Sequence, residues 1–258
     1  MAIDLSAQKF QQLAELRYVA TSKRIRAALD GETVVDTTSA YLVWEPKRVV
    51  PMYAVPESEL ALELSEHDPL APPEGVGPVI PPYHLDWHIF PGRSLHLGDQ
   101  GEVAFRPDEP ELGGRVVLHW DPFEWTEEEE PVVVHPHDPF ARIDVLRASR
   151  HVRVEVGGVT IAESTRPTAL YETGLPTRWY LPPEDVRMDL LSPSERRTGC
   201  AYKGFATYFD FEDAPAVAWT YLDPLHEAMG VKRMLSFWHD AAVYVDGVAV
   251  PTGMPGEG

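Results

Sequence analysis

The feature that most constrains this sequence is a match between two of its own segments. Residues 22–66 align without a gap on residues 149–193, and roughly a quarter of the aligned positions are identical. The identical pairs include Arg26 with Arg153, Gly31 with Gly158, and Glu45 with Glu172. Because an ungapped match of this length indicates duplication, the sequence predicts two tandem copies of one small domain.

The predicted domains are residues 1–145 and residues 146–258 of the 258-residue chain, each of ordinary domain size. The first copy is the divergent one. Its additions are a predicted N-terminal helix over residues 5–16 and a proline- and glycine-rich loop over residues 68–82. Four consecutive glutamates at residues 127–130 are expected to form a solvated loop.

Both copies show the patterns of β structure. Val152, Val154 and Val156 alternate with polar residues, which is the period of a half-buried strand. The pair Gly157-Gly158 then predicts a tight hairpin, as do Asp30-Gly31 and Asp246-Gly247. Further predicted elements are aromatic strands at residues 205–211, 217–222 and 234–238, and one short helix at residues 183–191. The predicted fold class is therefore mainly β with a few short helices.

A looser, gapped alignment extends the repeat to the segment around the single cysteine. It places residues 94–98 over residues 200–204, Trp120 over Trp219, and His137-Asp138 over His239-Asp240. In this alignment Gly98 keeps the place of Gly204, whereas Ser94 and Leu97 replace Cys200 and Lys203. The turn is then a property of the fold, and the thiol and the amine are additions of the second copy. This alignment makes the second copy the expected working domain.

Charge and cysteine content exclude several classes of function. The net charge of -19 repels phosphate backbones and anionic membranes, so neither nucleic acid nor a membrane is an expected partner. One cysteine allows no internal disulfide and no zinc site built on several thiolates. Since the sequence has no membrane-spanning run and no signal pattern, the expected location is the cytoplasm, and no cofactor is predicted.

The second copy closely resembles a bacterial family, the domain-of-unknown-function family numbered 427, which also carries a nucleotidyltransferase-type label. The residues that carry the resemblance are Arg150–Val154, Ala162–Ser164, Tyr171–Tyr180, Thr198–Gly204 and Ala218–Tyr221. The resemblance implies a curved, tent-like β sheet, here in a tandem two-copy form, and no established reaction. Spaced aspartates with a Gly-Ser loop, as metal-dependent nucleotidyl transfer requires, are missing. The sequence departs from the family at Ala201, where proline is usual.

The strongest predicted site lies in the second copy. A lysine three residues after a cysteine favours a nucleophilic thiolate, so Cys200 and Lys203 are the candidate catalytic residues. The candidate binding residues around them are Glu172, Arg178, Tyr180, Tyr202, Trp219 and Tyr221. Arginine and lysine there would hold a carboxylate or phosphate. Two alternatives stay open, namely an inert, buried cysteine and an Arg178–Glu172 ion pair that only pins a loop.

Histidines of the first copy raise a metal hypothesis. His84 and His88 would share one face of an extended strand, and His135 and His137 lie two residues apart. Extended chain and surrounding aromatics make a structural role the favoured interpretation, and no metal site is predicted. The predicted function is a small-molecule site in the second copy, possibly catalytic; the alternative is a non-enzymatic scaffold for a protein or an extended ligand.

Overall fold

The protein is described by a computed structural model that covers residues 2, 4, 11–80 and 87–253. The chain divides into two compact units, Met1–Asp138 (unit 1) and Pro139–Gly258 (unit 2). The predicted boundary at residue 145 falls within strand β12 (Ile143–Arg147), which pairs with strand β15 (Thr168–Glu172) of unit 2. Within the described residues, no helix has both the length and the apolar character needed to cross a bilayer.

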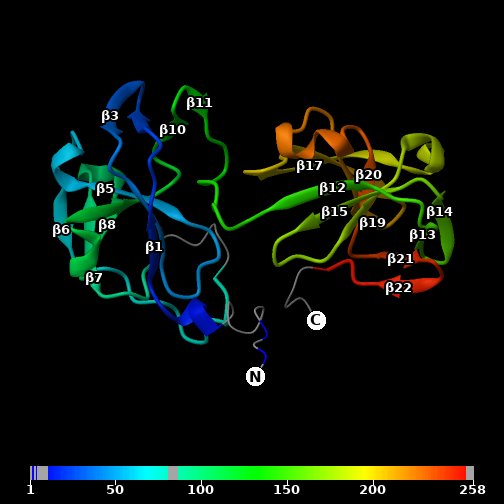
Figure 1. The fold of residues 1–258 in the computed structure, drawn as a ribbon, viewed down its shortest axis with the longest axis horizontal. Helices are drawn as coiled ribbons and strands as arrows, with labels where there is room; N and C mark the ends of the chain where they lie inside the picture. The colour runs from blue at the N-terminus through cyan, green and yellow to red at the C-terminus, as the bar shows by residue number, and fades with distance from the viewer. Residues whose placement is uncertain (1, 3, 5–10, 81–86, 254–258) are drawn as a thin grey trace. The chain divides into compact units, whose positions relative to one another are not determined.

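The prediction of a mainly β fold is confirmed (Figure 1). The strands of unit 1 are β1 (Arg17–Ala20), β2 (Ile25–Leu29), β3 (Glu32–Thr37), β4 (Tyr41–Trp44), β5 (Met52–Pro56), β6 (Ser65–His67), β7 (Gly92–His96), β8 (Glu102–Pro107), β9 (Arg115–Leu118), β10 (Glu124–Glu127) and β11 (Glu130–Pro131). Short 3-10 helices accompany them: η1 (Gln12–Ala14), η2 (Glu57–Glu59), η3 (Gly98–Gln100) and η4 (Pro110–Leu112).

Unit 2 is built in the same way. After β12, its strands are β13 (Val152–Val156), β14 (Val159–Ser164), β15 (Thr168–Glu172), β16 (Arg178–Tyr180), β17 (Ser192–Cys200), β18 (Gly204–Phe211), β19 (Ala214–Tyr221), β20 (Leu235–Phe237), β21 (Ala241–Val245) and β22 (Val248–Val250). Its 3-10 helices are η5 (Pro183–Asp185), η6 (Met188–Leu190) and η7 (His226–Val231).

The two units share one strand order. Unit 1 has a seven-stranded sheet, β1-β4-β5-β9-β8-β7-β6, and a four-stranded sheet, β11-β10-β2-β3. Unit 2 has β14-β13-β21-β22 as the counterpart of the smaller sheet. Its remaining sheets, β12-β15-β16 and β17-β18-β19-β20, meet through an isolated bridge between Leu181 and Leu235. Across this bridge, the order β12-β15-β16-β20-β19-β18-β17 repeats that of the large sheet of unit 1.

The correspondence extends to individual backbone positions. Strands β2 and β3 align with β13 and β14 at the constant offset of the sequence repeat, with Ile25 on Val152 and Glu32 on Val159. Both hairpins turn on two residues with positive φ, Asp30-Gly31 (52° and 82°) and Gly157-Gly158 (56° and 82°), the geometry of a type I′ turn. Both ladders also shift register at the same place, after Ala27 and after Val154. The hairpins that the sequence predicts are therefore present.

Strand registers contradict the looser part of the predicted alignment. Ala54 pairs with Val117 in unit 1, and Leu181, the repeat counterpart of Ala54, bridges to Leu235 in unit 2, so Val117 corresponds to Leu235. Following the ladders from this pair, Ser94 of β7 corresponds to Thr207 of β18. Ser94 is therefore not the counterpart of Cys200, and Trp120 corresponds to Trp238 instead of Trp219. The gapped alignment was wrong because the hairpin strands differ in length between the units.

Each unit encloses its own core. In unit 1 both sheets contribute to the core, which includes Ile25, Trp44, Tyr53 and Leu118. In unit 2 the sheet β14-β13-β21-β22 packs through Val152, Val154 and Val243 against Leu235 and Phe237. A second cluster of unit 2 gathers Leu170, Tyr180, Tyr208, Trp219 and Tyr221. Alternate side chains along β13 are buried, as the valine pattern predicts. Through these side chains the strand packs on the core.

Three local predictions differ from the structure. Of the N-terminal helix predicted over residues 5–16, residues 5–10 lie outside the described part, and the remainder contains only η1. The single helix predicted over residues 183–191 is two 3-10 turns, because Val186 between them bridges to Ala162 in the sheet. The predicted acidic loop is a tight hairpin between β10 and β11, with Glu128 at a φ of 50°.

Candidate functional site

The predicted thiol, amine and carboxylate of unit 2 lie together. Glu172 ends β15, Cys200 ends β17, and Lys203 closes the turn that leads into β18. Lys203 Nζ donates a hydrogen bond to Glu172 Oε2 at 2.5 Å, and it also interacts with the Cys200 side chain. Lys203 is buried, with 8% of its surface exposed, whereas Cys200 is half-buried. We call these three residues the Lys203 cluster.

The turn that holds Lys203 requires glycine at its end. Gly204 has a φ of +85°, a conformation that side-chain-bearing residues rarely adopt. The Lys203 carbonyl then accepts a hydrogen bond from Leu225 N at 3.2 Å. The backbone is thereby fixed on the C-terminal side of the lysine, whose side chain reaches Glu172 at the end of β15.

The Lys203 cluster is an electrostatically coupled group. Burial acts to lower the pKa of the Lys203 amine, but Cys200 and Glu172 more than compensate, so that its pKa is raised above the ordinary value. The lysine is therefore a buried ammonium that is held by a carboxylate. A thiol beside such a charge is the arrangement in which cysteine becomes a nucleophile.

The aromatic residues predicted to line the site belong mainly to the core. Tyr180, Trp219 and Tyr221 are all buried, and Trp219 Nε1 donates a hydrogen bond to Tyr180 Oη at 3.1 Å. Burial is the main cause that raises the pKa of both tyrosines. Their rings belong to a core cluster of unit 2, and Tyr202 is half-buried in the turn that leads into β18.

Arg178 has partners other than the expected glutamate. Its guanidinium lies 5.7 Å from the Trp219 ring centroid and donates hydrogen bonds to the carbonyl oxygens of Thr252 and Gly253. Glu172, which the alternative interpretation paired with Arg178, forms an ion pair with Lys203. A surface hollow of about 630 Å³ exists in unit 2, but it is lined by residues such as Arg147, Arg166 and Met234 and by none of the predicted site residues.

Unit 1 has a buried polar cluster at the matching place. Glu45, the counterpart of Glu172, accepts a hydrogen bond from His88 Nδ1 at 2.8 Å. His88 comes from the segment that leads into β7, just as Lys203 comes from the turn that leads into β18. Arg48 Nε lies 3.6 Å from the same Glu45 oxygen. Both units therefore bury a glutamate against a basic side chain.

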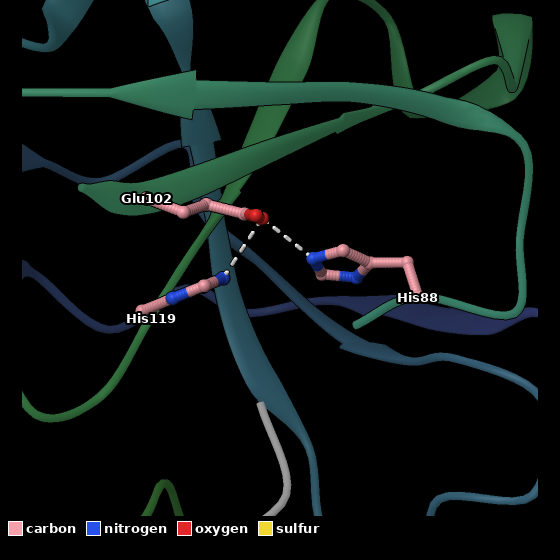
Figure 2. Close-up of side chains that lie close together, drawn as sticks. All are labelled: His88, Glu102 and His119. Carbon is pink, nitrogen blue, oxygen red and sulfur yellow. Dashed lines mark hydrogen bonds and ion pairs between the residues drawn. The ribbon is translucent and has the colours of Figure 1, made fainter. Parts of the chain in front are cut away.

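The cluster in unit 1 continues beyond this pair. His88 Nε2 lies 2.7 Å from Glu102 Oε1, and His119 Nε2 lies 3.2 Å from the same oxygen (Figure 2). Ser94 Oγ donates a hydrogen bond to the second Glu102 oxygen at 2.6 Å. Although burial opposes it, the neighbouring His119, His88 and Ser94 side chains lower the pKa of Glu102 to about 2. In the described chain, His88, Glu102 and His119 are the side chains grouped closely enough to hold a metal ion.

Sequence reasoning considers His88 only together with His84, which lies outside the described residues, and it misses Glu102 and His119. These two residues are brought together by the pairing of β8 with β9, so no short motif connects them. The one available signal is the identity of Glu45 with Glu172 in the repeat, which marks the carboxylate position of both units.

Residues 144–250 match the family described as Domain of unknown function (DUF427), in a single copy that begins in β12 and ends with β22. No curated protein matches the chain. The match covers most of unit 2 and agrees with the resemblance that the sequence of the second copy indicates.

Proposed function

We propose that unit 2, which carries the match to the DUF427 family, binds a small polar or anionic molecule at the Lys203 cluster, with Cys200 as its reactive group. The observation that carries this proposal is the placement of a buried ammonium against both a carboxylate and a half-exposed thiol. A structural ion pair alone needs no thiol, and burying charges costs free energy that an apolar pair would not.

The roles within the proposed site follow from position. Lys203 stabilises the thiolate of Cys200 or a negative charge that develops on the bound molecule. Glu172 keeps the amine charged and fixes its direction. Arg178, on the strand next to β15, supplies a second cation that suits a carboxylate or phosphate group.

Alkylation of the single cysteine tests this proposal. In the native protein iodoacetamide should label Cys200, and Lys203→Met should slow labelling at neutral pH about tenfold or more, because the thiolate loses its neighbouring charge. Lys203→Arg, which keeps the charge, should restore part of the rate. The matched control is Lys232→Met, since Lys232 forms an exposed ion pair with Asp223 and lies away from the cysteine in sequence. Labelling that occurs only after denaturation contradicts a reactive thiol.

A thermal-shift panel of nucleotides, sugar phosphates and dicarboxylates tests the binding step. We expect at least one class to raise the midpoint of unfolding, and we expect Arg178→Ala and Lys203→Met to remove that shift. The absence of any shift across the panel in the folded wild-type protein contradicts a small-molecule site.

A second candidate function is a scaffold that binds a protein or an extended peptide. It is favoured by β17, a nine-residue strand at the edge of its sheet whose residues are mostly exposed, because a free edge can pair with an added strand. A partner that protects the β17 amides from hydrogen exchange supports this function. Affinity purification that recovers no partner counts against it.

The proposal also covers the origin of the two units and the cellular location of the protein. The shared strand order, and the one constant offset that relates β2 to β13 and β3 to β14, support descent of both units from one duplicated domain. An experimental structure with different strand orders in the two units would overturn this. We assign the protein to the cytoplasm, where a lone reactive thiol is kept reduced.

A further inference from the structure

We propose that unit 1 binds a divalent first-row transition-metal ion through His88, Glu102 and His119 (Figure 2). Their ligand atoms all lie within 4.8 Å of one another. Glu102 Oε1 is 2.7 Å from His88 Nε2 and 3.2 Å from His119 Nε2. A central ion with bonds of about 2.0–2.2 Å separates its ligand atoms by about 3 Å. The three side chains therefore need only small movements to close around an ion.

The residues behind the ligands have the arrangement of an outer coordination shell. Glu45 Oε1 holds His88 Nδ1 at 2.8 Å, which leaves Nε2 to face the proposed ion. A carboxylate on the far nitrogen of a ligating histidine is the usual support in metal sites. Ser94 Oγ in turn holds Glu102 Oε2 at 2.6 Å, which leaves Oε1 directed at both histidines.

His119 provides an independent observation. Its Nε2 is fully buried and makes no hydrogen bond of good geometry with any residue that the structure describes, although Glu102 Oε1 is near it. A buried ring nitrogen without a well-formed hydrogen bond is unfavourable, and such groups require an explanation, for example a bound ion. This nitrogen is directed at the Glu102 carboxylate, which His88 Nε2 also faces (Figure 2).

Unit 2 shows that the fold does not require these polar side chains. Val117 corresponds to Leu235, so His119, two residues later, corresponds to Phe237. Glu102 pairs with His96 across a β-bulge, and the equivalent pair in unit 2 is Ala218 with Phe209, so Glu102 corresponds to Ala218. Ala218 and Phe237 are buried in the core of unit 2. Apolar residues therefore serve the same two positions, and a purely structural role does not explain a glutamate and a histidine there.

Charge and access also suit a cation. Within the described residues, the groups around the proposed ion are two carboxylates, Glu45 and Glu102, against one guanidinium, that of Arg48. The side chain of His88 is 3% exposed, and those of Glu102 and His119 are 12% and 11% exposed, so the proposed site lies close beneath the surface of unit 1. Two imidazoles and one carboxylate favour Zn²⁺ or Co²⁺ over Mg²⁺ and Ca²⁺, which prefer oxygen ligands only.

Calorimetric titration of the metal-stripped, full-length chain with Zn²⁺ tests the proposal. We expect one saturable site. His119→Phe, which copies Phe237 of unit 2, and Glu102→Gln should each weaken binding more than about 100-fold, because outer-shell changes already cost 10–100-fold. Glu45→Gln should weaken it about 10–100-fold. The matched control is His96→Asn, because His96 stacks on His67 at 4.1 Å in the same unit and could bind zinc adventitiously.

The absorption spectrum of the Co²⁺-loaded wild-type protein gives a second readout that needs no variant to fold. Nitrogen and oxygen ligands should give visible bands without a thiolate-to-cobalt band, and Cys200→Ser should leave the spectrum unchanged. The proposal is overturned if Zn²⁺ does not saturate a site, if His96→Asn abolishes binding while His119→Phe retains it, or if a thiolate band appears. These outcomes do not depend on the Lys203 cluster, so each of the two proposals can fail alone.

Discussion

Glu45 and Glu172 occupy equivalent positions in the two units, and each binds a buried basic side chain. That side chain precedes β7 in unit 1 and β18 in unit 2. The partner of Glu45 is His88, at 2.8 Å, and the partner of Glu172 is Lys203, at 2.5 Å. The carboxylate is thus constant, whereas the basic side chain differs. The two units therefore place different basic groups beside an equivalent carboxylate.

Removing one partner of the Lys203–Glu172 pair should destabilise unit 2 strongly. The side chains are 11% and 14% exposed, so Lys203→Met leaves a nearly buried carboxylate without its partner. We expect a loss of about 3 kcal/mol in the free energy of unfolding, measured by urea denaturation. The double variant Lys203→Met/Glu172→Leu should recover most of the loss. Lys232→Met, in an exposed pair, should change stability by less than about 1 kcal/mol, and an equal loss in both single variants contradicts the argument.

The same pair should make stability depend on alkaline pH. The folded protein raises the pKa of Lys203 above its ordinary value of 10.5, so near that pH the native state binds more protons than the unfolded state. The contribution is therefore complete below about pH 10.5 and is lost as the pH rises through the folded value. Urea denaturation from pH 8 upward should show a steeper alkaline decline for wild type than for Lys203→Met. Parallel curves would show that the lysine is not coupled in this way.

The sequence predicts the first half of each unit well because β2–β3 and β13–β14 are local hairpins. Their glycine turns and alternating valines act over a few residues, and such signals can be read without tertiary structure. The longer hairpins are different. Their register depends on pairing across the sheet. The gapped alignment therefore aligns Ser94 with Cys200, although the strand ladders show that Ser94 corresponds to Thr207.

The same limit applies to the candidate sites: local groupings of residues can be predicted, whereas groupings made by strand pairing cannot. The grouping of Cys200 with Lys203 and Glu172 could be predicted because two of the residues share one turn and the third is marked by the repeat. The grouping of Glu102 with His119 could not, because it arises from adjacent strands and an unmarked loop. Burial also divides the predicted set, since Tyr180, Trp219 and Tyr221 face the core.

Tyr180 should matter for stability because of its hydroxyl group. Tyr180→Phe removes the acceptor of the Trp219 Nε1 hydrogen bond and leaves that buried donor unpaired, at a cost of about 1–3 kcal/mol in the free energy of unfolding. The control is Tyr171→Phe, because Tyr171 is 43% exposed and should change stability by less than about 0.5 kcal/mol. If Tyr180→Phe leaves the stability unchanged but removes the ligand-induced rise in the midpoint of unfolding, the Tyr180 hydroxyl acts in ligand binding and not in the core.

Gly204 should be intolerant of a side chain because of its backbone and not for lack of space. A Cβ there would make only ordinary contacts, the nearest at 3.6 Å to Leu225, but its φ of +85° is unfavourable for alanine. We expect Gly204→Ala to lower the free energy of unfolding by about 1–2 kcal/mol. Gly77→Ala is the matched control, since its φ is not in the positive range and its nearest contact is at 3.8 Å, and it should be within about 0.5 kcal/mol of wild type. Because the same turn positions Lys203, Gly204→Ala should also slow alkylation of Cys200. A variant with lower stability but an unchanged labelling rate would show that the turn does not affect the reactivity of Cys200.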